Sequence, residues 1–414
     1  MTERRSGEYG MAKLGRRAFL SRSAAAAALG AIGGCATVGD EIGRTYPGWR
    51  PGELDIHFIH TGTSENTFLI FPDGTTMLLD CGHVPVRRPG YAEALPPMPS
   101  GSRRASEWVR RYIERLIPQR EIDYMMVSHW HSDHIAGIPD VAQSFKFLNF
   151  FDHQFPNVGK YSWGMDVEDF EIIQAWLKEA RKDGLKHEPF KVGAKDQIHL
   201  LHDAGNYYSR VFEIRNIAAN GVVWDGKNGV RDVVGEHVKQ TGKEKIAENS
   251  LSAVIRIRYG NFSYFSGGDI EGEFIGADGT KAKYEALVGA VTGHVEVCKT
   301  NHHAFYHSMC AEFVRQVSPK LYLSSTWSPN QINDITLPNM TSRELYPGDR
   351  TIAYGSIPKF KREAYAARGL FADAAPEGHA VVKVAPGGFW YRLYTLSAAD
   401  ESMRIVGKKD FFCC

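Results

Sequence analysis

Short apolar runs recur along the chain from about residue 54 and are separated by turns rich in Gly, Pro, Asp and Asn. Runs of about four to eight such residues bounded by turn residues are typical of β-strands. The pattern predicts strands at residues 54–60, 66–71, 76–79, 123–127, 146–151, 251–258, 262–266, 295–299 and 321–325. A last pair, 379–384 and 389–394, flanks a Pro-Gly-Gly turn and predicts a hairpin.

Helical periodicity occurs between several of these strands. Apolar residues from Trp108 to Leu116 recur at the spacing of one helix face, and Ser106 is the expected N-cap. Residues 167–182 form a second amphipathic pattern, and residues 308–317 form a third. Because strands and helices alternate along the chain, the sequence predicts an α/β fold.

The domain organisation follows from what the pattern lacks. No internal repeat and no low-complexity linker divides residues 53–414, so we expect a single domain that includes the C-terminal strands. Residues from about 155 to 248 include a polar, Gly-containing stretch that is hard to assign, and we predict an insertion there. Residues 36–52 are the expected linker.

The first 35 residues resemble a bacterial export signal. Arg16 and Arg17 form a twin-arginine pattern, and a small, uncharged run that is too short to span a bilayer follows at residues 23–34. The run ends in Ile-Gly-Gly-Cys, which resembles a lipoprotein cleavage box and makes Cys35 a candidate for lipidation. We therefore expect export by the twin-arginine route to the periplasm, with or without a lipid tether.

Composition narrows the choice of partners. The formal net charge of the 414 residues is +1, and loss of residues 1–34, with six basic and two acidic side chains, would leave −3. Tight binding of long nucleic acid needs many Lys and Arg contacts with phosphate, so this charge gives no reason to expect it, whereas small anionic substrates remain open. The mature chain has no apolar run long enough for a transmembrane helix. Its cysteines are scattered without CxxC spacing, which excludes a disulfide framework.

The stretch "SHWHSDHIAG" places four ligand-type residues directly after the strand predicted at residues 123–127. Imidazole and carboxylate groups bind zinc and similar ions at about 2.0–2.2 Å. His129 and His131 fit one ion, and Asp133 and His134 fit a second ion about 3.5–4 Å away. A merely polar loop would not explain these four residues after a buried strand, at the strand end where α/β proteins carry their chemistry.

This stretch is similar to the HxHxDH signature of the metallo-β-lactamase-fold hydrolases. Further similarities follow in the same chain order, namely Asp80-Cys81-Gly82, Ser266-Gly267-Gly268-Asp269 and Asn301-His302-His303-Ala304. The chain most resembles the branch that contains the hydrolase domain of the competence DNA-uptake protein and the bacterial phosphorylcholine esterases. The matching stretches include "HFIHTGTSENTFLIFPDGTTMLLDCG", "IDYMMVSHWHSDHIAG", "NSLSAVIRIRYGNFSYFSGGD" and "VEVCKTNHHAF". This resemblance implies a four-layer αββα sandwich.

The resemblance also implies a site for two divalent transition-metal ions, zinc or manganese. The implied ligands are His129, His131, Asp133, His134, Asp269 and one of the adjacent pair His302 and His303. Asp80 would support the metal loop without binding the ions, and Asp133 would also act as the catalytic base. Asn249 is an implied substrate contact.

Two departures from the family pattern concern the ligands. The family often has a further histidine in a Gly-His context before the bridging aspartate, and this chain has none there. His153 is the best candidate for that ligand, although a histidine without a metal role fits the position as well. Ala304 stands where the family usually has glycine.

The implied reaction is hydrolysis by a metal-bound hydroxide. The resemblance to this branch implies a phosphodiester or phosphoester substrate, and together with the near-neutral charge it favours a small or lipid-derived ester over nucleic acid. A carboxylic ester or lactone is the alternative, because the same nucleophile attacks either centre. A second alternative is an exported binding protein whose site has degenerated, which would retain little metal and hydrolyse nothing.

Overall fold

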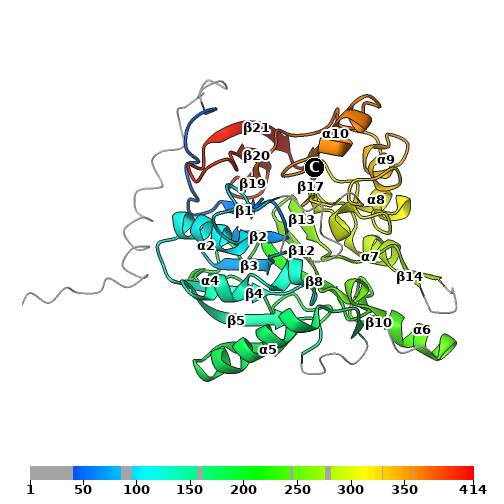
Figure 1. Ribbon diagram of the computed structural model, residues 1–414. Helices are drawn as coiled ribbons and strands as arrows, with labels where there is room; N and C mark the ends of the chain where they lie inside the picture. The colour runs from blue at the N-terminus through cyan, green and yellow to red at the C-terminus, as the bar shows by residue number, and fades with distance from the viewer. Residues whose placement is uncertain are drawn as a thin grey trace, which may run out of the picture. The chain divides into compact units, whose positions relative to one another are not determined.

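Two β-sheets, built largely from the predicted apolar runs, form the centre of the computed structural model (Figure 1). The structure describes residues 41–84, 96–155, 162–242, 246–275, 281–328, 330–357 and 359–414. The predicted export signal at residues 1–35, with Cys35, lies outside the described residues, as does the start of the predicted linker.

The first sheet contains nine strands within the described ranges, in the order β21-β20-β19-β1-β2-β3-β4-β5-β7. Their bounds are β1 (Leu54–Phe58), β2 (Asn66–Ile70), β3 (Thr76–Cys81), β4 (Glu121–Met126), β5 (Lys146–Asp152), β7 (Lys186–Pro189), β19 (His379–Val384), β20 (Trp390–Leu396) and β21 (Ile405–Phe412). From β21 to β3 neighbouring strands are antiparallel, and from β3 to β7 they are parallel. The C-terminal hairpin predicted from the sequence therefore extends the same sheet as β1.

The second sheet contains eight strands of the described residues, in the order β10-β9-β8-β12-β13-β16-β17-β18. Their bounds are β8 (Phe212–Ala219), β9 (Val222–Trp224), β10 (Val230–Asp232), β12 (Val254–Tyr259), β13 (Phe262–Ser266), β16 (Val297–Lys299), β17 (Leu321–Leu323) and β18 (Thr351–Ala353). Strands β13, β16, β17 and β18 are parallel, so their C-terminal ends meet at one edge.

Helices and short strand pairs complete the described fold. The helices are α2 (Ala105–Leu116), α3 (Ser132–Ile135), α4 (Ile138–Ala142), α5 (Val167–Lys182), α6 (Val233–Thr241), α7 (Glu285–Thr292), α8 (Ala311–Val317), α9 (Thr336–Thr341) and α10 (Lys359–Ala366), with 3₁₀ turns η1 (Glu248–Leu251) and η2 (Asn301–Ala304). The short pairs are β6 (Ser162–Trp163) with β11 (Ile246–Ala247), and β14 (Glu273–Ile275) with β15 (Lys281–Lys283).

Three buried apolar clusters separate the layers. Ile56 of β1 and Ile255 of β12 belong to the cluster between the sheets. Val109 of α2 packs on the outer face of the first sheet, and Phe313 of α8 packs against Phe265 on the outer face of the second. Helices α2, α4 and α5 accordingly lie beside one sheet and α7 and α8 beside the other (Figure 1). The predicted αββα sandwich is confirmed.

Strand β3 illustrates why the sequence takes this form. Successive side chains of a strand point to opposite faces. Met77 and Leu79 enter the cluster between the sheets, whereas Leu78 enters the cluster under α2. Because both faces are covered, the run from Met77 to Leu79 is continuously apolar rather than alternating.

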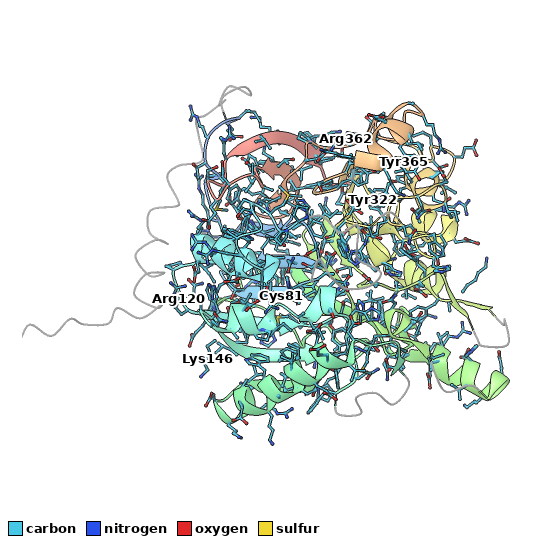
Figure 2. All side chains as sticks on the ribbon, in the orientation of Figure 1. Cys81, Arg120, Lys146, Tyr322, Arg362 and Tyr365 are labelled. Atoms are coloured by element: carbon cyan, nitrogen blue, oxygen red, sulfur yellow. The ribbon has the colours of Figure 1, made fainter. Side chains whose placement is uncertain are left out.

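The opposite ends of the parallel strands differ in exposure. Arg120 and Lys146 are exposed where β4 and β5 begin, whereas Cys81, at the C-terminal end of β3, is buried (Figure 2). The motif after β4 therefore starts at the buried end of the sheet.

The predicted cap of α2 is wrong. The helix begins at Ala105, and Arg104 is the N-cap, where its backbone N–H donates to Glu107 Oε2 at 2.9 Å. Ser106 lies inside the first turn and donates its hydroxyl to Asp140 of α4. A contact between two helices has thus replaced the local cap, which sequence spacing does not reveal.

The stretch predicted as an insertion contributes to both sheets. β7 pairs with β5 in the first sheet, and β8 pairs with β12 in the second. Residues 155–248 thus supply strands to both sheets, and their interpretation as an insertion stays a prediction. Residues 42–414 form one compact unit.

Among the described residues no helix is long and apolar enough to cross a membrane. The described cysteines, Cys81, Cys298, Cys310, Cys413 and Cys414, form no disulfide.

Candidate metal centre

Asp80 holds the loop that follows β4. The backbone N–H of Ser128 donates to Asp80 Oδ1 at 2.7 Å, and the Ser128 hydroxyl donates to Asp80 Oδ2 at 2.7 Å. Asp80 Oδ2 also lies 2.8 Å from His134 Nδ1. A carboxylate on one ring nitrogen fixes the orientation of a metal-binding histidine. The contact leaves His134 Nε2 to face the residues that gather opposite it.

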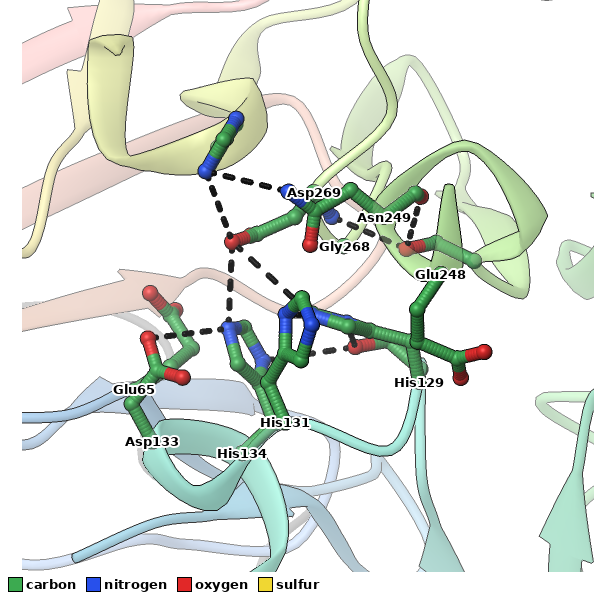
Figure 3. A network of polar contacts seen from close by, with 12 residues as sticks. Glu65, His129, His131, Asp133, His134, Glu248, Asn249, Gly268 and Asp269 are labelled. Carbon is green, nitrogen blue, oxygen red and sulfur yellow. Dashed lines mark hydrogen bonds and ion pairs between the residues drawn. The ribbon is translucent and has the colours of Figure 1, made fainter. Parts of the chain in front are cut away.

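Four buried side chains form a compact cluster, namely Asp133, His134, Asp269 and His303. Each offers one ligand atom, and these atoms all lie within 4.8 Å of one another. Asp269 Oδ2 is 3.3 Å from His134 Nε2 and 3.1 Å from His303 Nε2. Asp133, His134 and Asp269 converge from two sides in Figure 3. Two imidazoles and two carboxylates are a donor set that suits a divalent transition-metal ion.

The turn that carries Asp269 approaches the loop after β4 because it begins with two glycines. A Cβ atom on Gly267 would lie 2.2 Å from Asn301 Oδ1, and one on Gly268 would lie 2.8 Å from Ser128 Cβ. Gly268 also has a φ of 56°. The Gly267-Gly268-Asp269 sequence therefore lets β13 deliver a carboxylate beside Ser128.

His303 reaches the cluster from an unusual loop after β16. His302, His303 and Ala304 have φ values of 45°, 52° and 58°. Left-handed backbone in residues other than glycine costs about 1–3 kcal/mol each and persists only where the surroundings hold it. Ala304 thus adopts the conformation for which the family's usual glycine is suited. The ring of Trp327 packs on His303, with the ring centroids 4.5 Å apart.

A protein-family model described as the metallo-β-lactamase superfamily matches residues 60–198, the region that holds the loop after β4. The chain contains a metallo-β-lactamase superfamily domain. None of the curated proteins searched matches the chain.

Solved structures similar to this metallo-β-lactamase domain include three proteins. A protein described as a metal-dependent hydrolase from Parabacteroides distasonis is 11% identical, with 72% of this chain and 92% of that chain covered and a TM-score of 0.35. Zinc-bound PqqB from Methylobacterium extorquens is 10% identical, with 79% and 98% covered and a TM-score of 0.38. The diiron β-hydroxylase CmlA from Streptomyces venezuelae is 11% identical, with 72% and 50% covered and a TM-score of 0.37.

His129 and His131 lie beside the cluster of four ligands. His129 Nε2 is 3.0 Å from His131 Nδ1 and 4.0 Å from Asp269 Oδ2. His131 Nε2 lies 3.0 Å from the carbonyl oxygen of Gly164. Among the described residues, these two histidines do not form a four-ligand group of their own. Of the two predicted metal positions, the one built on Asp133 and His134 is therefore the one that has a full group of four ligands.

His302 lies outside the cluster, so the structure distinguishes the two adjacent histidines. His302 Nδ1 is 3.3 Å from Glu271 Oε1, and its Nε2 is 3.2 Å from Asn249 Nδ2. The ring stacks on Phe305, with centroids 4.7 Å apart. Asn249, the implied substrate contact, thus lies beside His302 rather than in the four-ligand group.

His153 contacts a carboxylate that does not belong to the cluster. His153 Nε2 lies 2.8 Å from Glu248 Oε1, which also accepts a 2.8 Å hydrogen bond from the backbone N–H of Trp130. This candidate for the further histidine ligand is therefore engaged in holding the segment between His129 and His131.

Two further charged residues, Glu65 and Lys299, border the cluster. Lys299 is buried, and its Nζ donates to Asp269 Oδ1 at 3.1 Å and to the Gly268 carbonyl at 2.6 Å. Glu65 Oε2 lies 3.8 Å from Lys299 Nζ and 3.4 Å from His303 Nδ1. Burial raises the pKa of Asp269, but the charges of His303, His134 and Lys299 outweigh it and hold that pKa well below its ordinary value. Asp269 therefore stays ionised and presents Oδ2 to the cluster.

Sequence reasoning missed Glu65, Glu248, Glu271 and Lys299. Glu65 and Lys299 lie in stretches that resemble the family, and each is a charged residue beside an apolar strand. A buried charge needs a partner, so a charged residue in or next to a strand expected to be buried was the available signal of a polar site. The partner of each comes from a distant segment, so the signal identifies an unusual position without assigning its role.

Metal uptake by this cluster is expected to release about two protons per ion at pH 7. Burial lowers the pKa of His303, but Asp269 and Asp133 outweigh burial and raise it to about 10. The pKa of His134 is likewise raised well above its ordinary value, since Asp269, Asp133 and Asp80 outweigh burial. Both rings therefore carry a proton at neutral pH that a metal ion must displace, and affinity should fall as pH is lowered. Titration calorimetry in buffers of different ionisation enthalpy measures this number, and release of no proton would contradict the assigned ligands.

A cavity of about 410 Å³ opens beside the metal centre. Its walls include His131, Glu248, Asn249, Glu271, His302 and Phe305. No Lys or Arg is among the described residues that line it. Ligands of this cavity thus meet carboxylates, imidazoles and aromatic rings next to the metal cluster.

Proposed function

We propose that the protein is an exported metal-dependent hydrolase that cleaves a phosphodiester or phosphoester bond. The observation that carries the proposal is the four-ligand cluster of Asp133, His134, Asp269 and His303 beside a cavity of about 410 Å³. His302 lines this cavity and its Nε2 lies 3.9 Å from Asp269 Oδ2, and convergent metal ligands next to a cavity are the arrangement expected of an active site. The superfamily match supports metal-dependent hydrolysis, and the choice of a phosphorus ester is our own.

The ligands fit two divalent ions, which we propose to be zinc, with manganese as the alternative. Asp133, His134, Asp269 and His303 would hold one ion, and His129 and His131 would share Asp269 with the other. Imidazole-rich sites favour zinc, whereas oxygen-rich sites favour manganese. A bound ion would lower the pKa of water toward about 7 and stabilise charge that develops on the ester oxygens.

Protein side chains would orient the reacting groups. Asp133 is buried, and the charges of His134 and His303 outweigh burial and hold its pKa below the ordinary value. An ionised Asp133 can accept a hydrogen bond from the attacking water and orient it. Asn249 and His302 line the cavity and would contact the substrate.

The charge of the cavity supports a small ester over nucleic acid. A nucleic-acid channel combines basic and aromatic residues along its length. The described residues that line this cavity include Glu248 and Glu271 but no Lys or Arg. We therefore propose a small or lipid-derived phosphodiester or phosphoester as the substrate.

Export is proposed from the N-terminal sequence alone. The twin-arginine pattern at Arg16 and Arg17 supports transport of the folded chain, and Cys35 would carry the lipid if the protein is tethered. Replacement of both arginines with lysine is the direct test, because retention of the full-length chain in the cytoplasm is expected.

A two-substrate assay tests the proposed reaction. Zinc-loaded mature protein is expected to cleave bis-(p-nitrophenyl) phosphate faster than p-nitrophenyl acetate, since the site is proposed to stabilise a phosphorus transition state. His131→Ala should lose this activity, and His294→Ala, at an exposed histidine outside the site, should keep it. Hydrolysis of the acetate alone would favour a carboxylic ester or lactone. Inactivity on both substrates with zinc and with manganese would contradict the enzyme proposal.

A further inference from the structure

A buried carboxylate, Glu285 at the first position of α7, closes the loop that carries the two adjacent histidines. Glu285 Oε1 accepts hydrogen bonds from Asn301 Nδ2 and from the backbone N–H of Met309, both at 2.7 Å. Glu285 Oε2 accepts one from the backbone N–H of Cys310 at 2.7 Å. Asn301 opens the loop and Met309 and Cys310 end it, so a single side chain ties both ends together.

The loop between these anchors is the strained one. His302, His303 and Ala304 all have left-handed backbone, and so does Met309, with a φ of 53°. Such a run persists only when surrounding contacts determine it. On its far side, the Ala304 carbonyl accepts hydrogen bonds from Asn333 Nδ2 at 3.1 Å and Thr336 Oγ1 at 2.9 Å. Glu285 supplies the corresponding restraint at the loop's base.

Asn301 extends this restraint to the Gly267-Gly268-Asp269 turn. Asn301 is fully buried, and its Oδ1 atom occupies the space that a side chain on Gly267 would need, 2.2 Å from the Cβ position. Gly267 opens the turn that carries Asp269. The backbone N–H of His302 also donates to the Gly268 carbonyl at 3.3 Å. Glu285 and Asn301 together therefore adjoin both loops that supply the cluster from the second sheet.

Stability alone does not account for a carboxylate at this position. Glu285 is fully buried, and its three donors are uncharged. A buried carboxylate without a cation is costly, and neutral residues are usually preferred in such places. Burial accordingly raises the pKa of Glu285 to about 7, with the hydrogen bonds from Asn301 and Cys310 opposing the rise. What the carboxylate provides is two oxygens that accept from three donors at once.

We propose that Glu285 is a positioning residue that, through Asn301, sets the separation of His303 and Asp269 and thereby the affinity of the metal centre. The inference rests on the proposed metal binding, although Glu285 itself is not a ligand. Supporting groups outside the ligand shell typically change metal affinity about 10–100-fold when they are replaced.

Glu285→Gln tests this role, because the amide cannot accept from all three donors. The zinc affinity of the full chain is measured by competition with a chromophoric chelator, together with the thermal midpoint with and without zinc. We expect affinity to fall about 10–100-fold and the stabilisation by zinc to shrink. Glu312→Gln is the matched control, since Glu312, on the neighbouring helix α8, forms an exposed ion pair with Lys283 of β15. The control should bind zinc like the wild type.

Asn301→Ala is the second variant, because it cuts the link to the Gly267 turn while the two backbone hydrogen bonds to Glu285 remain. It too should weaken zinc binding. Unchanged zinc affinity in a folded variant, with an equal loss of thermal midpoint in both metal states, would assign Glu285 to the fold and overturn the inference. Failure of both variants to fold would also overturn it. Absence of zinc binding by the wild type would instead contradict the proposed function.

Discussion

Asp269→Ala is expected to weaken metal binding by more than about 100-fold and to reduce ester hydrolysis to background. Asp269 is the residue on which the site converges, because its Oδ2 atom lies within 4.0 Å of nitrogen atoms of His129, His134, His302 and His303. Its loss would also leave Lys299 buried beside the remaining histidines without its nearest carboxylate. Only the more distant Glu65 would then compensate the Lys299 charge, and a buried cation compensated less well opposes the binding of a second positive charge.

The measurement pairs two quantities on the same preparations. Zinc affinity is determined by chelator competition, and the rate on bis-(p-nitrophenyl) phosphate is determined with zinc in excess. Asp349→Ala serves as the control, since Asp349 is exposed and far from the cluster in the chain. Wild-type zinc affinity in Asp269→Ala would show that the ligands had been assigned wrongly.

His303→Ala is expected to lower the metal content, whereas His302→Ala is expected to leave it unchanged. His303 lies in the buried cluster, so its loss should weaken zinc binding by more than about 100-fold. His302 lies against Glu271 and Asn249 at the cavity, so its loss should leave metal content unchanged and raise KM for the ester. The left-handed backbone is common to both residues, which makes each variant the control for the other.

Elemental analysis of the two variants after gel filtration decides between them. Equal loss of zinc in both would mean that the loop, rather than the individual rings, controls binding. Loss in His302→Ala alone would exchange the two assignments.

The positions of many strands along the chain, and of the loop after β4, could be predicted because they depend on local pattern. Residues 123–127 are a short apolar run, and the structure places β4 at Glu121–Met126 directly before the ligands. The resemblance to the family added the αββα layers, which the superfamily match supports. Both kinds of information are carried by residues close together in the chain.

The remaining features depend on contacts between distant segments. His302 and His303 are neighbours of the same residue type, and only the left-handed turn of the backbone sends one to Asp133 and the other to Glu271. Glu248 contacts Trp130 across more than a hundred residues. A sequence pattern does not contain these distances, so the roles of such residues emerge only from the folded chain.

The zinc content of the purified wild-type chain tests the central claim most directly. Protein exposed to zinc, passed through gel filtration and analysed by elemental mass spectrometry is predicted to retain at least one ion per chain at the cluster of Asp133, His134, Asp269 and His303. Retention of two ions would support the further role proposed for His129 and His131. A folded wild-type chain that retains neither zinc nor manganese would contradict the account of this protein as a metal-dependent hydrolase.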